Sequence, residues 1–475
     1  MSRIFLFKKK QLNRRDAEEQ RKNHKLWCSV TLPIWRDCCN PFISLRLCAS
    51  AVKQLPFLGL FLLSASLPAM AAETLANYPD LPPPAAVEAA IRNSPDVLAA
   101  QAGIKVGEAV RQRLQAGEHE VTLRLMGQRR SVNPDERYRE WDVGLERAIR
   151  LPGKAALDGK MGNVEVARSQ TMYGDALHET GRVLLKAWFS WNRERAQSQQ
   201  WTDQVELLKN QAGIVAKRVR AGDAPRLESD LAEAAVAQAE SALYQARLRQ
   251  QVAANELGQR FPVIPLPTSV PASAPVPLQQ GLEYWKEEIL RHNHELSVAR
   301  NEAALGRLHS ERSSADKLPD PTVGLRFGGE RDGAEHIVGL HVSMPFPGGA
   351  RSARADESRA LAEMAAQREA AILRKVTAEA VNSFAAAQAA YGGWQSAQSA
   401  ADKMRGNAEL MARAYALGEM GLPEVLTARR QALEANLAAS LARLDAAETR
   451  YRLLLDSHQL WPLDIDGEDE DHAHH

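Results

Sequence analysis

The stretch from Leu151 to Pro225 reads LPGKAALDGKMGNVEVARSQTMYGDALHETGRVLLKAWFSWNRERAQSQQWTDQVELLKNQAGIVAKRVRAGDAP. Between Pro152 and Pro225 it contains 72 residues without proline, and it is rich in Ala, Gln, Glu, Arg and Leu. This composition favours helix. If ~66 of these residues are helical at ~1.5 Å per residue, the helix is ~100 Å long. An ordinary globular domain does not need such a helix, so the sequence predicts a rod that spans a distance.

A second run with similar boundary residues follows, with 75 proline-free residues between Pro347 and Pro423. Both runs open on Pro-Gly, at Pro152-Gly153 and Pro347-Gly348. Both end at a glycine followed by an acidic residue, at Gly222-Asp223 and Gly418-Glu419. Matching segments stay roughly 195–199 residues apart, which indicates an internal duplication. We therefore predict one architecture built twice.

The domain boundaries follow from the residue pairs that bound each run and from the proline-rich stretches between the runs. Six prolines between Pro262 and Pro277 predict an extended connector between the two halves. The predicted segments are a leader with signal peptide (1–71), a Pro-rich N-terminal segment (72–84), a first structural repeat (85–261), a Pro-rich linker (262–279), a second structural repeat (280–461) and an acidic His-containing tail (462–475).

The leader carries an export signal. Leu55–Leu67 is an apolar run, and Ala69-Met70-Ala71 fits a small-x-small cleavage site. This pattern is typical of a secretory signal peptide and is too short for a membrane-spanning helix. The 50 residues before it are unlike a signal n-region, and Val52 would be an ordinary start if its codon is GTG. The alternative is a long natural leader.

Removing residues 1–71 changes the charge and the cysteine count. The full chain has a formal net charge of +1, whereas the rest has 48 basic and 55 acidic residues and a net charge of −7. That balance argues against nucleic acid as a partner. All four cysteines also lie in the leader. The exported part therefore has no disulfides, offers no cysteine for a lipid anchor, and must be stabilised by packing or assembly.

Two pairs of candidate strands precede the Pro-Gly pairs. In each strand apolar and polar residues alternate, as in a sheet with one apolar face. Four strands do not close a membrane barrel, whose smallest examples use eight, so several chains would share one. Two amphipathic hairpins packed on a soluble core are the alternative. The alternating apolar residues are Val121, Leu123 and Leu125; Trp141, Val143 and Leu145; Val323, Leu325 and Phe327; and Val338, Leu340 and Val342.

The rods themselves show the period of helix–helix packing. Small and apolar residues recur at steps of three and four, which predicts coiled coils. Antiparallel coiled coils with no further function are the alternative for either rod alone. The repeating residues are Val205, Leu208, Ala212, Val215 and Val219 in the first rod, and Val376, Ala380, Ser383, Ala387, Ala390 and Trp394 in the second.

The order and spacing of these features resemble the TolC-type outer-membrane factors, the outer membrane efflux protein family, and loosely its cobalt-zinc-cadmium heavy-metal branch. The resemblance covers essentially all of the chain after the leader. The strand-to-helix joints carry it, at Leu151–Lys154 and Pro345–Arg351, together with the helix-tip turns at Arg220–Asp223 and Ala416–Gly421. Leu318–Pro321, before the third strand, also looks like the family.

The resemblance implies a mainly α fold with a small β part, built as a duplicated helix–β-hairpin–long helix–helix repeat. It implies a homotrimer whose three chains form a 12-stranded outer-membrane β-barrel, continuous with a periplasmic α-helical coiled-coil barrel. The implied function is the passive outer-membrane channel of a tripartite efflux system. The implied partners are a periplasmic adaptor (membrane fusion protein), an inner-membrane RND pump and outer-membrane lipid, with no cofactor and no nucleic acid.

By the same resemblance, acidic side chains close the channel at the helix tips. The position six residues after the tip glycine is Glu228 in the first half and Glu424 in the second. Asp223 and Glu419, directly after the glycines, complete the predicted periplasmic gate. Rings of carboxylates select cations and constrict a pore. The alternative is that these glutamates only complement the helix dipole.

The tail suggests a cargo. It combines carboxylates with imidazoles, which are ligands for divalent zinc, nickel, cobalt and copper, and predicts weak metal binding at His472, His474, His475, Asp469 and Asp471. Divalent heavy-metal cations are therefore the predicted cargo. A solvated acidic end is the alternative reading of the tail, and organic compounds or drugs are the alternative cargo.

Enzyme motifs are absent from the sequence. His178-Glu179 has no second histidine at the metalloprotease spacing, and there is no phosphate loop, GxSxG or CxxC. We therefore predict no enzyme activity. A periplasmic coiled-coil adaptor is a further alternative, but adaptors contain one hairpin in a β-rich domain, whereas this chain has two. A soluble coiled-coil scaffold would not need detergent for extraction.

Overall fold

A computed structural model describes residues 78–132, 136–269, 273–461 and 463. These residues all belong to one compact unit, Ala71–His475. The leader, the signal peptide and the metal-binding residues predicted in the tail lie outside the described residues.

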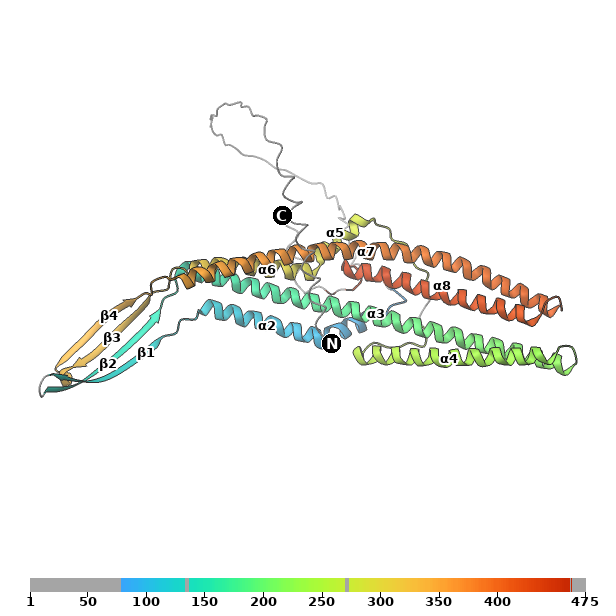
Figure 1. The fold of residues 1–475 in the computed structure, drawn as a ribbon, viewed down its shortest axis with the longest axis horizontal. Helices are drawn as coiled ribbons and strands as arrows, with labels where there is room; N and C mark the ends of the chain where they lie inside the picture. The colour runs from blue at the N-terminus through green and yellow to red at the C-terminus, as the bar shows by residue number, and fades with distance from the viewer. Residues whose placement is uncertain (1–77, 133–135, 270–272, 462, 464–475) are drawn as a thin grey trace, which may run out of the picture. The chain divides into compact units, whose positions relative to one another are not determined.

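The order helix, helix, strand, strand, long helix, shorter helix occurs twice along the chain (Figure 1). The first half contains α1 (Pro84–Arg92), α2 (Pro95–Ala116), β1 (Thr122–Val132), β2 (Glu136–Ala148), α3 (Pro152–Arg220) and α4 (Arg226–Arg260). The second contains α5 (Leu282–His292), α6 (His294–Ala315), β3 (Thr322–Glu330), the 3-10 turn η1 (Arg331–Gly333), β4 (Glu335–Ser343), α7 (Gly349–Ala416) and α8 (Leu422–Asp456). The prediction of a mainly helical chain with a small antiparallel sheet is confirmed.

The two predicted rods are α3, with 69 residues, and α7, with 68 residues. At ~1.5 Å per residue each is ~100 Å long. Each begins directly after a strand and ends at a glycine with a positive φ, +76° at Gly222 and +77° at Gly418. Glycine adopts this left-handed conformation without the steric cost of a side chain, which is why it stops a helix at this position.

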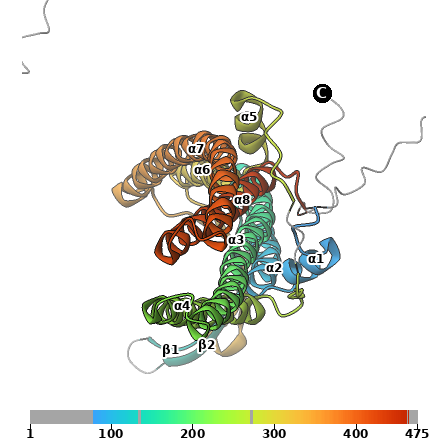
Figure 2. The same cartoon turned by 90° about the vertical axis from the view of Figure 1, so that its right-hand side faces the viewer.

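The long helices pack in pairs along their lengths. Helix α4 returns along α3, and α8 returns along α7, while α8 also contacts α3 (Figures 1 and 2). The positions predicted from the spacing of three and four lie at these contacts. Val205, Leu208 and Val215 are buried in the first rod, and Val376 and Ala380 in the second. The small side chains of Ala380 and Ala387, which are also buried, let the helices approach closely in the second rod.

The main hydrophobic core surrounds the middle of α3. Its largest members there are Trp188, Trp191 and Phe189, which are 2%, 3% and 0% exposed. Residues of α1 and the end of α8 pack against this part of α3, and α5 joins the same core through α7 and α8. The N-terminal helix and the C-terminal end of the described chain are therefore fixed to the same section of the rod.

The four strands form one antiparallel sheet in the order β1-β2-β3-β4. The pairing of β2 with β3 joins the two halves, with Gly144 opposite Arg326 and Leu145 opposite Leu325. β1 and β4 are the edge strands within this chain. Their outer hydrogen-bonding groups are therefore available for pairing with another strand.

The connection between the halves runs from Phe261 to Gly281 and has no helix or strand among its described residues. Of the helices in the described ranges, none has the length and apolar character needed to cross a membrane.

Candidate functional site

Charged side chains of the sheet gather on one face. The Arg124 Nη2 atom lies 2.6 Å from Glu146 Oε1, and His341 Nε2 lies 3.2 Å from Glu146 Oε2. Arg326 forms an ion pair with Asp142. Because successive residues of a strand point to opposite faces, these residues share one face. The other face is apolar over the part of the sheet near the helices and carries Arg129, Arg137 and Arg139 at the far end. The sheet thus has one charged face and one largely apolar face.

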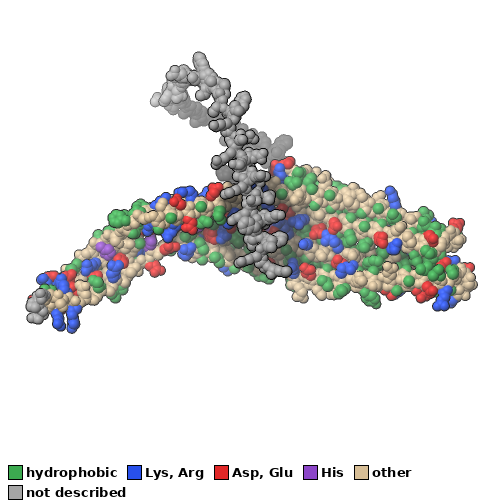
Figure 3. Space-filling view, in the orientation of Figure 1, with side chains coloured by type: hydrophobic (Ala, Val, Ile, Leu, Met, Phe, Trp, Pro, Cys, Tyr) green, Lys and Arg blue, Asp and Glu red, His purple; other side chains and the backbone are tan. Residues whose placement is uncertain are grey.

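The apolar face is exposed in the single chain. Leu125, Val338 and Leu340 are 69%, 73% and 70% exposed. Apolar side chains also lie at the surface of the long helices (Figure 3). Tyr244 on α4 and Leu417, directly after α7, are 72% and 75% exposed. Exposed apolar surfaces of this extent are typical of proteins that meet lipid or further protein chains.

The first strand-to-helix joint is built around a buried lysine. Pro152 is the first residue of α3, a position that favours proline because its missing N–H would have no partner there. Lys154, two residues later, is only 2% exposed. Its Nζ atom lies 3.0 Å from Asp316 Oδ1 and 2.9 Å from Asp320 Oδ1. These two aspartates belong to the second half, so the lysine links the halves at the joint.

Asp320 is the most strongly held carboxylate of this joint. It contacts Lys154, it lies 2.9 Å from His119 Nε2, and it accepts a hydrogen bond from the backbone N–H of Leu151 at 3.2 Å. Burial by itself would raise the pKa of Asp320, but the hydrogen bonds from His119 and Lys154 lower it to about 2. The carboxylate is therefore ionised at neutral pH.

A second carboxylate, Asp158, extends this network along α3. It accepts hydrogen bonds from Arg150 Nη1 at 2.8 Å and from Arg312 Nε at 2.6 Å. Arg150 also donates to the carbonyl oxygens of Leu114 and Gln115 at the end of α2. The first joint thus ties the ends of α2, β2 and α6 to the start of α3.

The second joint differs from the first. Pro347 precedes α7 rather than beginning it, and Gly348 is the N-cap. Phe346 is 95% exposed, and Arg351 donates one hydrogen bond to the carbonyl oxygen of Asp316 at 2.9 Å. A side chain added at Gly153 or Gly348 would meet no atom within 4 Å. The predicted joint residues thus mark where the long helices begin, while Lys154 and its aspartates fix the geometry.

The two helix tips have the same backbone geometry. After α3, the N–H of Asp223 donates to the carbonyl oxygen of Arg218 at 2.8 Å. After α7, the N–H of Glu419 donates to the carbonyl oxygen of Ala414 at 2.9 Å. This is the Schellman motif, which satisfies the last carbonyl groups of a helix. Asp223 and Glu419 are exposed at these turns.

Glu228 is held by a residue of the other half. The Tyr415 hydroxyl, near the end of α7, donates to Glu228 Oε2 at 2.8 Å. The Arg218 guanidinium lies over the Tyr415 ring, 4.9 Å from its centroid. Burial, followed by the hydrogen bond to Glu228, raises the pKa of Tyr415. This tip cluster, Arg218, Tyr415 and Glu228, connects the ends of the two rods.

Glu424 occupies the matching position of the second half, but it is exposed in the first turn of α8. Its Oε2 atom folds back toward Gly421, where an added Cβ would lie 2.7 Å from it. Within the described chain, no hydrogen bond or ion pair joins Glu424, Glu228, Asp223 and Glu419 to one another. The single chain therefore places all four at the tips without bringing them together.

Sequence reasoning missed Tyr415, Arg218 and Lys154. One signal for Tyr415 was available, because the residue three positions before the tip glycine is tyrosine in the second half and Val219 in the first. A polar residue that breaks a match between two halves indicates a contact specific to one of them. A lysine two residues after Pro152 gave no comparable signal.

Four histidines gather beside the main core. The His178 ring stacks on that of His458 with centroids 4.6 Å apart, and His292 and His294 lie 5.0 and 5.1 Å from His458. Burial and the neighbouring charges lower the pKa of His178 to about 2, so its ring is neutral. In the part of the chain that the structure describes, no group of three or more His, Cys, Asp or Glu side chains is arranged to hold a metal ion.

Comparison with solved structures identifies the fold. The chain is similar to the CmeC outer membrane channel of Campylobacter jejuni (TM-score 0.68, 13% identity, 80% of this chain and 86% of that one). It is also similar to the outer-membrane channel OprN (0.69, 17%, 78% and 89%) and to the open state of the Neisseria gonorrhoeae MtrE outer membrane channel (0.64, 15%, 79% and 89%). No protein-family model matches the chain, and comparison with curated proteins finds no match either. The chain thus has the fold of these outer membrane channels.

Proposed function

We propose that this protein is the outer-membrane channel of a tripartite efflux system and acts as a passive exit duct. The observation that carries the proposal is the two-faced sheet joined directly to helices of 69 and 68 residues. The apolar face suits lipid and the charged face suits an aqueous passage. The helices are long enough to carry that passage ~100 Å away from the membrane.

We propose a homotrimer for this duct. The open edges of β1 and β4 would pair between neighbouring chains, and three sheets of four strands would form a 12-stranded barrel in the outer membrane. The long helices would extend it through the periplasm, where their tips would meet an adaptor and an inner-membrane RND pump. The matching order of elements supports an internal duplication as the origin of the two halves.

Conductance tests this function directly. Purified protein added to a planar lipid bilayer is expected to give discrete, ohmic channel events. If the protein fractionates with the outer membrane but never conducts, the duct is rejected. Extraction without detergent would support a soluble coiled-coil scaffold instead.

For the cargo we propose divalent heavy-metal cations, on the composition of residues 464–475, which lie outside the described structure. Ordering a chain segment around an ion costs conformational entropy, so the tail is expected to bind weakly, at about micromolar or poorer, and more weakly below pH ~6.5. Calorimetry of the tail peptide with zinc, cobalt and nickel measures this. Deletion of residues 466–475 should lower metal tolerance only modestly. If the tail peptide gives no heat with any of these ions, the tail does not bind the cargo.

A further inference from the structure

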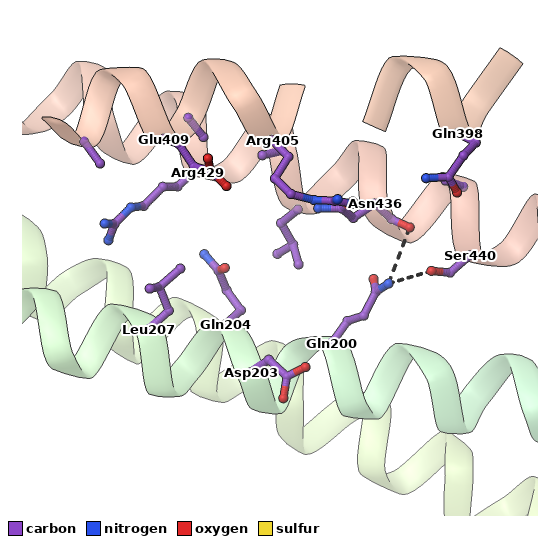
Figure 4. A pocket seen from close by; sticks show the side chains of 15 residues that line it. Gln200, Asp203, Gln204, Leu207, Gln398, Arg405, Glu409, Arg429, Asn436 and Ser440 are labelled. Atoms are coloured by element: carbon purple, nitrogen blue, oxygen red, sulfur yellow. Dashed lines mark hydrogen bonds between the residues drawn. The ribbon is translucent and has the colours of Figure 1, made fainter. Parts of the chain in front are cut away.

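A cleft of about 550 Å³ lies between α3 and the α7–α8 pair (Figure 4). It is separate from the joints and from the acidic residues of the tips. Its volume falls within the range of ~300–1,000 Å³ that is typical of small-molecule sites. Its walls are Gln200 to Leu207 on α3, Gln398 to Ala412 on α7 and Arg429 to Ser440 on α8.

Arg429 extends from α8 into the space between α8 and α3, on the side of Leu207 (Figure 4). Its Nη1 atom is buried and has no hydrogen-bond partner among the described residues. Burial lowers the pKa of Arg429, and no neighbouring acid offsets this effect. The residue as a whole is half-buried, but a buried donor atom without a partner costs free energy, part of which a bound anion would recover.

The other arginine of the cleft provides a contrast. Arg405 Nη2 donates to Asn436 Oδ1 at 2.7 Å, and its Nη1 lies 3.4 Å from Asp402. Gln200 on α3 donates to Ser440 Oγ at 2.8 Å (Figure 4). Gln200 Oε1 is also buried without a partner among the described residues, but it is an acceptor and does not bind an anion. Arg429 is therefore the cation left to recognise an anionic ligand.

The acidic residues at the cleft do not form an ion pair with Arg429 in the described structure. Asp203 and Glu409 both line it, but both are exposed to solvent. Asp203 accepts a hydrogen bond from Gln199 Nε2 at 2.9 Å, and Glu409 forms no ion pair with Arg429 in the described structure. Water screens their charges more strongly than that of the half-buried Arg429 guanidinium.

We propose that this cleft binds a small organic carboxylate through Arg429. A planar guanidinium matches the two oxygens of a carboxylate with parallel hydrogen bonds. Leu207, Leu433, Ala408 and Ala432 supply apolar walls for the organic part of the ligand, which an inorganic anion would not use. The site does not depend on the proposed export function, because every residue that forms it belongs to one chain.

Isothermal titration calorimetry on the full protein in detergent tests the proposal. The probes are naphthalene-2-carboxylate and the neutral, similarly shaped naphthalene-2-carboxamide. We expect the carboxylate to bind and the carboxamide to bind at least about tenfold more weakly. Equal binding of the two probes, or no heat with the carboxylate, overturns the proposal.

Two matched variants locate the site. Arg429→Gln is expected to weaken carboxylate binding by about tenfold or more, whereas Arg405→Gln, whose guanidinium is already bonded, should change it less than about threefold. Arg429→Gln should not lower the melting temperature, since it removes an unpaired buried charge. Loss of binding only in the Arg405 variant would assign the ligand to Arg405, and a large loss of stability in the Arg429 variant would assign Arg429 to structure. Either result rejects the proposed site.

Discussion

The first strand-to-helix joint buries Lys154 between two aspartates, whereas the second leaves Phe346 95% exposed. The tips differ in the same sense, because Glu228 is bound by Tyr415 while Glu424 is exposed. Both halves have the same order of elements, yet the first half holds its ends with polar contacts inside the chain. Matched elements of the two halves therefore make different contacts. The joint and the tip of the first half are held by side chains of the second half, whereas Phe346 and Glu424 at the matching positions are exposed.

The largest expected effect comes from Lys154→Met. The change leaves Asp316 and Asp320 without their shared buried cation and should lower the free energy of unfolding by about 3 kcal/mol. Arg351→Met, at the second joint, removes one hydrogen bond and should cost about 1 kcal/mol. Urea unfolding in detergent, followed by circular dichroism, measures both. Equal losses of unfolding free energy in the two variants would contradict the proposed difference between the joints.

Lowering the pH should weaken the first joint and destabilise the folded protein. The folded-state pKa of Asp320 is about 2, below its unfolded value of about 3.9. Its ionised form therefore stabilises the folded protein above about pH 4, and this contribution is lost as the pH falls from about 4 to about 2. Melting temperatures measured between pH 5 and pH 2 should fall less steeply in Asp320→Asn than in the wild type. Parallel curves would show that Asp320 is not held as described.

Tyr415→Phe should loosen the tips. It removes the hydroxyl that donates to Glu228 and should cost about 1 kcal/mol at this partly exposed site. If the tip cluster keeps the duct closed, the variant should spend more time open in planar bilayers. Tyr391→Phe is the control, since the Tyr391 hydroxyl accepts a hydrogen bond from Gln395 on the same helix. Identical open times in both variants would exclude Tyr415 from the gate.

The smallest effect on stability is expected for Glu424→Ala. If three copies of Glu424 line a constriction, the variant should conduct more and be blocked less by divalent or trivalent cations. Glu434→Ala, an exposed glutamate farther along α8, is the control. Unchanged conductance and block, with a loss of under about 1 kcal/mol in stability, would assign Glu424 to the helix dipole alone.

The parts of this molecule that were predictable are those set by local pattern. Proline-free composition predicted α3 and α7, and alternation predicted both faces of the sheet, because each pattern repeats the period of one element. The Tyr415–Glu228 contact joins residues 187 positions apart, and Lys154 reaches Asp320 from the other half. No periodic pattern in the sequence predicts such long-range contacts. They depend on how the halves pack, so they had to come from the structure.

The central claim is that this chain builds an outer-membrane duct from three copies. Multi-angle light scattering of the purified protein in detergent, corrected for bound detergent, measures the protein mass of the particle directly. The account predicts three chains per particle and a protein that leaves solution when detergent is removed. A stable monomer in plain buffer would contradict it.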